Sequence, residues 1–177
     1  MMTESIQDAG EPACGTVASE PTWDLVFAEQ LPRVYNFLRY RLGSEALAED
    51  LTSITFEKAW RHRHRYRRDL AKFSTWLLTI ARNTAVDHRR TEPLHSPLEA
   101  AENEAAAETP EEEAMLRSNF ARLSALLAGL PDRERELLAL KYGAGATNRA
   151  IAQVTGLSES NVGTIVHRAV AALRAKW

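Results

Sequence analysis

The stretch that decides the fold is NRAIAQVTGLSESNVGTIVHRAVAALR, residues 148–174. It divides into a short helix, a turn and a longer helix, because Gly156 can take the left-handed conformation that ends a helix. Ser158 can then cap the second helix by accepting a hydrogen bond from an exposed backbone N–H. The second helix carries an apolar stripe at spacings of four, three and four residues, formed by Val162, Val166, Ala169 and Leu173.

This layout is typical of a helix-turn-helix, in which the second helix enters the major groove of DNA. Polar side chains lie on the face opposite the apolar stripe, namely Ser160, Thr164, His167 and Arg168. An ordinary helical hairpin without a DNA-binding role would show the same caps and the same stripe. The stretch therefore predicts the hairpin and leaves DNA binding as a hypothesis that other regions must support.

Composition is typical of a folded protein of the cytoplasm. The 177 residues suffice for one domain or two small ones, with 45% hydrophobic and 26% charged residues. The single cysteine, Cys14, excludes an internal disulfide and a zinc site built from cysteines. We find no signal-peptide pattern and no apolar run of membrane-spanning length, so we expect a soluble cytoplasmic protein without membrane insertion.

The sequence argues against an enzyme. It contains no glycine-rich phosphate loop, no nucleophile arrangement and no set of metal ligands, and its five histidines are scattered. His62 and His64 are neighbours in sequence, but arginines surround them and no further ligand is near. We therefore expect no catalytic residue, no metal and no cofactor.

Charge alternates in blocks along the chain, although the net charge is only −2. Residues 1–55 carry a balance of −6, and residues 56–91 carry +7. Residues 92–113 carry −8, and residues 114–177 carry +5. Two basic regions thus flank an acidic one, which predicts two separate contacts with a polyanion.

The predicted fold class is all-α, because helical periodicity recurs along the chain and no strand pattern is found. Residues 1–20 lack periodicity and are expected to be a disordered lead-in. Three helices are predicted in the first part. One runs from Thr22 to Gly43 with a kink or break at Pro32, the second covers residues 45–60, and the third covers residues 73–90.

An acidic linker separates this part from the next. Residues 92–109 are rich in Glu and Ala and have no apolar stripe, so they are predicted to be flexible. Thr109 and Pro110 begin a further helix, Pro131 opens another, and Thr147 caps the helix-turn-helix. We therefore expect two small helical domains joined by an acidic flexible linker, the second being the helix-turn-helix domain.

Two features of the first part are suited to nucleic acid. The run RHRHRYRR, residues 61–68, surrounds Tyr66 with cations, which suits phosphate contact and base stacking, although a solvated basic helix end would look similar. In residues 73–90 the inward face is formed by Phe73, Leu77, Ile80 and Thr84. The opposite face suits base edges and phosphates, or plain solvent, and carries Thr75, Thr79, Arg82, Val86 and Arg89.

At the level of whole motifs the chain resembles bacterial sigma factors. The first part resembles their second conserved region at Ala48-Glu49-Asp50-Leu51, Thr55-Phe56, Ala59-Trp60, Phe73-Ser74-Thr75-Trp76-Leu77, Ile80-Ala81-Arg82-Asn83 and Asp87. The second part resembles their fourth region at Leu130-Pro131, Arg135, Leu138, Ile151-Ala152, Gly156-Leu157-Ser158, Val162, His167-Arg168-Ala169 and Leu173-Arg174. With one linker and nothing else between the parts, residues 23–177 resemble the small extracytoplasmic-function class of the housekeeping-sigma family.

The resemblance implies a promoter-specificity subunit of RNA polymerase without catalytic activity. Residues 21–91 would be region 2, which binds the polymerase clamp and the minus-ten element. Residues 110–177 would be region 4, which reads the minus-thirty-five element, and residues 92–109 would link the two. The implied partners are core RNA polymerase, through its β′ clamp and β flap, promoter DNA, and an anti-sigma factor.

Residue by residue, the resemblance assigns three sets of contacts. The polymerase contacts would be Glu49, Asp50, Ser53 and Phe56. The minus-ten contacts would be Arg65, Tyr66, Ser74, Thr79, Arg82, Asn83, Asp87 and Arg90. The minus-thirty-five contacts would be Ser160, Asn161, Gly163, Thr164, His167 and Arg168.

The chain departs from the family pattern at several positions. Leu47 stands where the family has an acid, Ser53-Ile54-Thr55 replaces a polar pattern, and Thr79 stands where an arginine is frequent. Gly163 and Ile165 stand where a basic residue is common. Promoter sequence, regulon, inducing signal and anti-sigma control do not follow from the sequence. The alternative function is a stand-alone helix-turn-helix regulator that does not bind polymerase.

Overall fold

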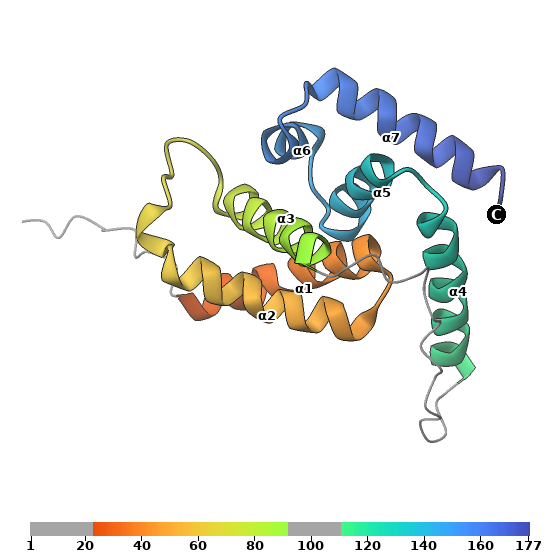
Figure 1. Cartoon of the computed structure of the whole chain (residues 1–177), viewed down its shortest axis with the longest axis horizontal. Coiled ribbons are helices and arrows are strands. Elements are labelled where there is room, and N and C mark those ends of the chain that lie inside the picture. The colour runs from red at the N-terminus through yellow and green to blue at the C-terminus, as the bar shows by residue number, and fades with distance from the viewer. Residues whose placement is uncertain (1–22, 92–110) are drawn as a thin grey trace, which may run out of the picture.

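The computed structural model describes residues 23–91 and 111–177, and every regular element in these two ranges is helical. The predictions for residues 1–20 and for the linker 92–109 lie outside them. The first range contains α1 (Trp23–Leu42), α2 (Glu45–Arg61), the short 3-10 turn η1 (Arg63–Arg65) and α3 (Phe73–Thr91). The second contains α4 (Glu111–Ala128), α5 (Asp132–Leu138), the π-helical turn η2 (Ala139–Gly143), α6 (Asn148–Thr155) and α7 (Glu159–Arg174) (Figure 1).

The helix ends follow the capping residues expected from the sequence. Ser158 Oγ accepts a hydrogen bond from the Asn161 N–H at 3.2 Å, and Thr147 Oγ1 accepts one from the Ala150 N–H at 3.2 Å. Gly156 ends α6 in the left-handed conformation, with φ of 76°. These contacts satisfy donors that a helix terminus would leave unpaired. The predicted helix-turn-helix is therefore confirmed as α6 and α7.

Pro32 does not break the first helix. The helix α1 runs unbroken from Trp23 to Leu42 with Pro32 inside it, and the Pro32 side chain is exposed. A proline removes one hydrogen bond of a helix, but its neighbours Gln30 and Val34 are buried and hold the helix against the core. The break considered from the sequence is thus absent, because tertiary packing outweighs the local cost.

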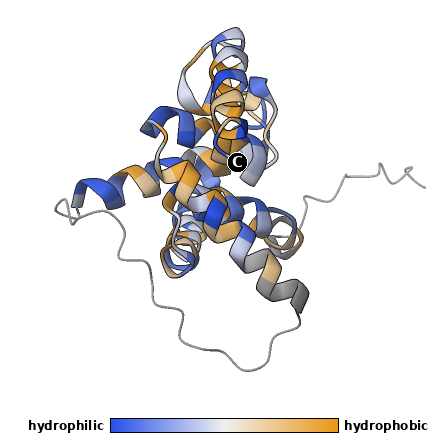
Figure 2. Ribbon diagram, turned by 90° about the vertical axis from the view of Figure 1, so that its right-hand side faces the viewer, coloured by the Kyte–Doolittle hydropathy of each residue, from blue (hydrophilic) through white to orange (hydrophobic). Residues whose placement is uncertain are grey.

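The two helical parts pack against each other and share one core. Helix α1 and turn η2 form one contact between them, and α3 and α6 form another (Figure 1). Most helices carry both hydrophilic and hydrophobic residues (Figure 2). The core is one continuous cluster whose fully buried members come from both parts, including Val34, Phe37, Leu38, Leu77, Leu137, Leu140, Ile151 and Val162. The sequence predicted the parts but gave no sign that they are joined in this way.

Candidate nucleic-acid interface

Helix α7 presents its predicted recognition face to solvent. The exposed side chains are Ser160, Asn161, Thr164, His167 and Arg168. The opposite stripe is inside, because Val162 is fully buried and Val166 and Ala169 are nearly so. The cap at Ser158 fixes where the helix begins and therefore which residues face outward. The five polar residues thus lie together on one accessible helix face.

Two positions on α7 that depart from the family pattern lie toward the rest of the protein. A Cβ added at Gly163 would lie 3.5 Å from Asn148 Nδ2, so this position faces α6. Ile165 is half-buried and packs against the core cluster. Of the predicted minus-thirty-five residues, Gly163 therefore lies at the edge of the exposed face.

The face of α3 that the sequence assigned to DNA or solvent lies largely against the second part of the chain. Thr75 is 4% exposed, so its expected outward position is wrong. Arg82 donates from Nε to Glu136 Oε1 on α5 at 3.0 Å. Arg89 forms an ion pair with Asp132, which also lies on α5. The cause is the contact of α3 with α5 and α6, which no local pattern records.

The predicted minus-ten residues other than Tyr66 therefore divide into two groups. Ser74, Thr79 and Arg82 are half-buried, and the Thr79 hydroxyl donates to the Thr75 carbonyl at 2.9 Å. The exposed residues are Arg65, Asn83, Asp87 and Arg90. Asp87 also lies 3.8 Å from Lys58 Nζ in an ion pair. The described structure thus leaves one edge of α3 and the preceding loop open to solvent.

Tyr66 is the structural anchor of the basic loop. Its ring centroid lies 5.2 Å from that of Phe73 and 5.4 Å from that of Trp76. Its hydroxyl donates to the Ala71 carbonyl at 3.2 Å. The side chain is half-buried rather than free for stacking, so the loop gains a fixed shape with exposed cations around it.

The predicted polymerase contacts on α2 differ in how exposed they are. Glu49, Asp50 and Ser53 are exposed. Phe56 is 5% exposed and packs on Phe27 with ring centroids 4.5 Å apart, so its assignment to a docking surface is wrong. Exposed apolar side chains of α2 are instead Ile54 and Trp60. Neither residue was among the polymerase contacts predicted from the sequence.

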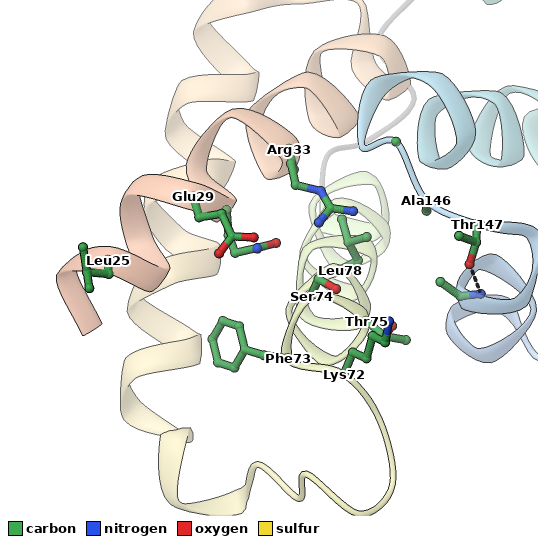
Figure 3. A pocket seen from close by; sticks show the side chains of 13 residues that line it. Leu25, Glu29, Arg33, Lys72, Phe73, Ser74, Thr75, Leu78, Ala146 and Thr147 are labelled. Atoms are coloured by element: carbon green, nitrogen blue, oxygen red, sulfur yellow. Dashed lines mark hydrogen bonds between the residues drawn. The ribbon is translucent and has the colours of Figure 1, made fainter. Parts of the chain in front are cut away.

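A cleft of about 460 Å³ lies where the two parts meet (Figure 3). Its walls come from α1, the start of α3 and the segment before α6. Arg33 extends from α1 across this boundary and donates from Nε to the Ala144 carbonyl at 2.9 Å. Among the described residues no group of three potential metal ligands is found.

Asp132 and Glu136 on α5 form ion pairs with the first part of the chain that the sequence did not predict. Asp132 accepts hydrogen bonds from Arg41 Nη1 and Nη2, both at 2.6 Å, and from Arg89. Burial raises the pKa of Asp132, but the bonds from these two arginines outweigh it and hold that pKa well below its ordinary value. Two acids one helical turn apart in a basic domain were the available signal.

Two solved structures share this fold. CnrH in complex with the cytosolic domain of CnrY matches with a TM-score of 0.66 and 24% identity, over 86% of this chain and 85% of that chain. The sigma factor RpoE from Bartonella quintana, in complex with the anti-sigma factor NepR, matches with a TM-score of 0.65 and 20% identity, over 86% and 94%. The fold is thus that of a two-part helical sigma factor.

Sequence comparisons give the family. Residues 26–93 match the model of sigma-70 region 2, and residues 120–173 match that of sigma-70 region 4. The sigma factor CarQ of Myxococcus xanthus is 32% identical over 88% of this chain and 89% of its own length. The sigma factor BldN of Streptomyces coelicolor is 32% identical over 79% of this chain, which spans 54% of BldN. The sigma factor SigM of Bacillus subtilis is 28% identical over 88% of this chain and 95% of its length.

The chain therefore belongs to the extracytoplasmic-function RNA polymerase sigma factors. Its function is to bind core polymerase and direct promoter recognition, and the alternative of a regulator that never meets polymerase is set aside. The family consists of transcription initiation factors and is not known for catalysis. No helix in the described part of the chain is long and apolar enough to cross a membrane.

Proposed function

We propose that α7 reads the minus-thirty-five element, that α3 and the loop before it read the minus-ten element, and that the acidic side of α2 docks on the β′ clamp. The observation that carries this proposal is the capped helix α7 with five polar side chains on one exposed face. Such a face matches the width of the major groove. Arg168 is suited to a guanine edge or a phosphate, and Asn161 to an adenine edge.

Each part supplies only a few cations to DNA. The slope of log K against log salt concentration is about −0.9 per neutralised phosphate, so each part alone would bind weakly at cellular salt. Polymerase holds both parts on one particle, which makes the second DNA contact nearly intramolecular. Affinity for the promoter then comes from two modest contacts that act together.

The linker has the length that this arrangement requires. The centres of the two promoter elements are about 25 base pairs apart, or about 85 Å at 3.4 Å per base pair. A segment as long as residues 92–109 can reach at most about 60 Å, at roughly 3.3 Å per residue, and the two parts add their own width. Its acidic residues suit a basic channel of the enzyme.

Strand opening requires no covalent chemistry from this chain. An unstacked base is captured at an energetic cost of a few kcal/mol, which contacts to the base and its phosphates offset. The loop around Tyr66 is suited to this task because the aromatic cluster beneath it holds the backbone while exposed cations such as Arg65 face outward.

The partners follow from the same assignment. Core RNA polymerase binds through its β′ clamp and β flap, and promoter DNA binds α3 and α7. The solved structures of CnrH and RpoE contain a CnrY domain and an anti-sigma factor, respectively, which supports an anti-sigma factor as a further partner of this chain. Because polymerase is inside the cell, the chain acts in the cytoplasm.

Run-off transcription with core polymerase on genomic fragments tests the proposed function and yields the promoter. We expect transcripts that depend on the added chain and begin at fragments sharing two elements. Arg168→Ala should weaken selection at the upstream element while the chain still binds core enzyme in a pull-down. Unchanged selection by this variant would place the reading of the upstream element elsewhere.

A further inference from the structure

A cluster of arginines and two carboxylates joins the two parts of the chain. Asp132 and Glu136 lie on α5, and three arginines reach them from the first part, namely Arg41 from α1 and Arg82 and Arg89 from α3. Asp132 also lies 3.4 Å from Arg135 Nη2 on its own helix. Four arginines thus meet two carboxylates. The cluster keeps an excess of positive charge, which is the condition under which a further anion is attracted.

The geometry of these contacts is that of arginine with phosphate. Arg41 binds the two oxygens of Asp132 with its two terminal nitrogens, both at 2.6 Å. This fork is the arrangement in which a guanidinium binds either a carboxylate or a phosphate. The Arg41 side chain is 3% exposed, so Asp132 supplies the counter-charge that a buried cation needs.

The same contacts cover the face of α3 that would meet DNA. Glu136 is 7% exposed and accepts a hydrogen bond from Arg82, a residue that the sequence analysis assigned to the minus-ten contact. A cleft of about 380 Å³ opens onto the cluster beside Arg82 and Arg89, so solvent and ions reach it. In this arrangement α3 cannot use these arginines for DNA while α5 stays in place.

A close backbone contact accompanies the ion pairs. A Cβ placed on Gly143 would lie 2.8 Å from the Asn36 carbonyl oxygen and 3.1 Å from the Phe37 Cα, both on α1. Both are backbone atoms of a packed helix, so they cannot move aside easily. The closed arrangement therefore requires a residue without a side chain at this position.

We propose that the structure is a self-inhibited closed state, in which Asp132 and Glu136 occupy arginines of the first part in place of DNA phosphates. DNA held by polymerase then competes for Arg82 and Arg89 and stabilises the open state, in which the two parts are separate. This inference rests on the proposed minus-ten role of α3. It adds that α5 regulates access to that face without any other protein.

Intramolecular fluorescence transfer in the full chain tests closure directly. The labelled protein is a variant in which Cys14→Ser removes the native thiol. Ala46→Cys on α2 and Ala172→Cys on α7, both at exposed positions, take the donor and acceptor dyes. Asp132→Asn removes one negative charge from the cluster of arginines and carboxylates. Glu134→Gln is the matched control, because it removes one charge from the same helix and no ion pair of the described residues involves Glu134. We expect lower transfer efficiency in Asp132→Asn than in the parent chain and an unchanged value in Glu134→Gln.

DNA binding gives the second readout. Anisotropy of a fluorescein-labelled duplex of mixed sequence, titrated at several salt concentrations, measures the number of phosphates neutralised. Opening should make Arg82 and Arg89 available to DNA, so the salt slope of Asp132→Asn should steepen by about 2 units, close to 0.9 per arginine. Glu134→Gln should leave the slope as in the parent. This readout needs neither polymerase nor a promoter, so its failure is separate from failure of the proposed function.

Gly143→Ala opens the interface without changing charge. We expect it to lower transfer and to steepen the salt slope, with the helical signal in circular dichroism retained. Gly129→Ala is the control, since its Cβ would lie 3.5 Å from its nearest neighbour, the Leu126 carbonyl oxygen, which is ordinary contact. Transfer in Asp132→Asn equal to that of the parent overturns the proposal. A salt slope that changes equally in Asp132→Asn and Glu134→Gln also overturns it.

Discussion

Helices α7 and α3 carry similar side chains for DNA but differ in what lies against them. The polar face of α7 is exposed along its length, whereas the matching face of α3 is covered by α5 and α6. Arg168 on α7 lies in solvent, and Arg82 on α3 forms an ion pair with Glu136. Side-chain type therefore indicates which helix is suited to DNA, while tertiary packing decides which helix is accessible at a given moment.

The largest expected effect separates polymerase docking from DNA reading. Replacing both Glu49 and Asp50 with Lys reverses the charge of the exposed α2 surface, and we expect association with core polymerase to be lost in a pull-down. Binding of the α7 face to a minus-thirty-five duplex should remain, because α2 lies outside the helix-turn-helix. Transcription at the wild-type level would show that the clamp contact lies elsewhere.

Because the two parts share one core, the helices that carry the α3 face and the α7 face are expected to unfold in one transition. Phe37 is fully buried on α1 next to Gly143, so Phe37→Ala should lower the free energy of unfolding by about 3–5 kcal/mol. Urea denaturation followed by circular dichroism should show one transition. Leu25→Ala, at a 66% exposed position, should stay within about 0.5 kcal/mol of the parent. Two resolved transitions in the parent would contradict the single core.

Loss of Arg168 should weaken DNA binding by the exposed face of α7. Arg168→Ala should weaken binding to a minus-thirty-five duplex by about 1–3 kcal/mol, roughly 5- to 150-fold, because a base or phosphate contact is lost. Association with core polymerase should be unchanged. Equal loss of both activities would indicate misfolding of the variant instead.

The smallest expected effect is a pH dependence of the stability that Asp132 contributes where α5 meets α3. The pKa of Asp132 is lowered in the folded chain, so its stabilising contribution is present above the ordinary pKa of about 3.9 and is lost as pH falls below it. The difference in unfolding free energy between the parent and Asp132→Asn should be constant from about pH 5 to 8 and shrink below about pH 4. Denaturant titrations at several pH values measure it, and a change between pH 6 and 8 would contradict this sign.

Much of the fold was predictable because its signals are local. Gly156, Ser158 and Thr147 act on backbone groups within a few residues, and the structure confirms the helix boundaries that they imply. The apolar stripe of α7 is also confirmed in position by Val162, Val166 and Ala169. Family resemblance then gave the functional class, which the comparisons confirm.

The site was predicted less completely because it depends on contacts between distant segments. Phe56 was assigned to a surface, yet Phe27, from another helix, covers it. Thr75 was expected outside, yet α6 packs near that side of α3. The ion pairs of Asp132 were not predicted, because its arginine partners lie on α1 and α3, far away in sequence. Periodicity identifies opposite faces of one helix but does not say which neighbour covers them.

The contact of η2 with α1 also has a consequence for synthesis on the ribosome. The surface of α1 around Asn36 and Phe37 is completed by Gly143, which the ribosome adds about 100 residues later. At 5–20 residues per second this interval lasts roughly 5–20 s, plus the time for the segment to leave the exit tunnel. During it the nascent first part has an uncovered apolar side and unpaired arginines. A newly made chain is therefore open before it is first closed.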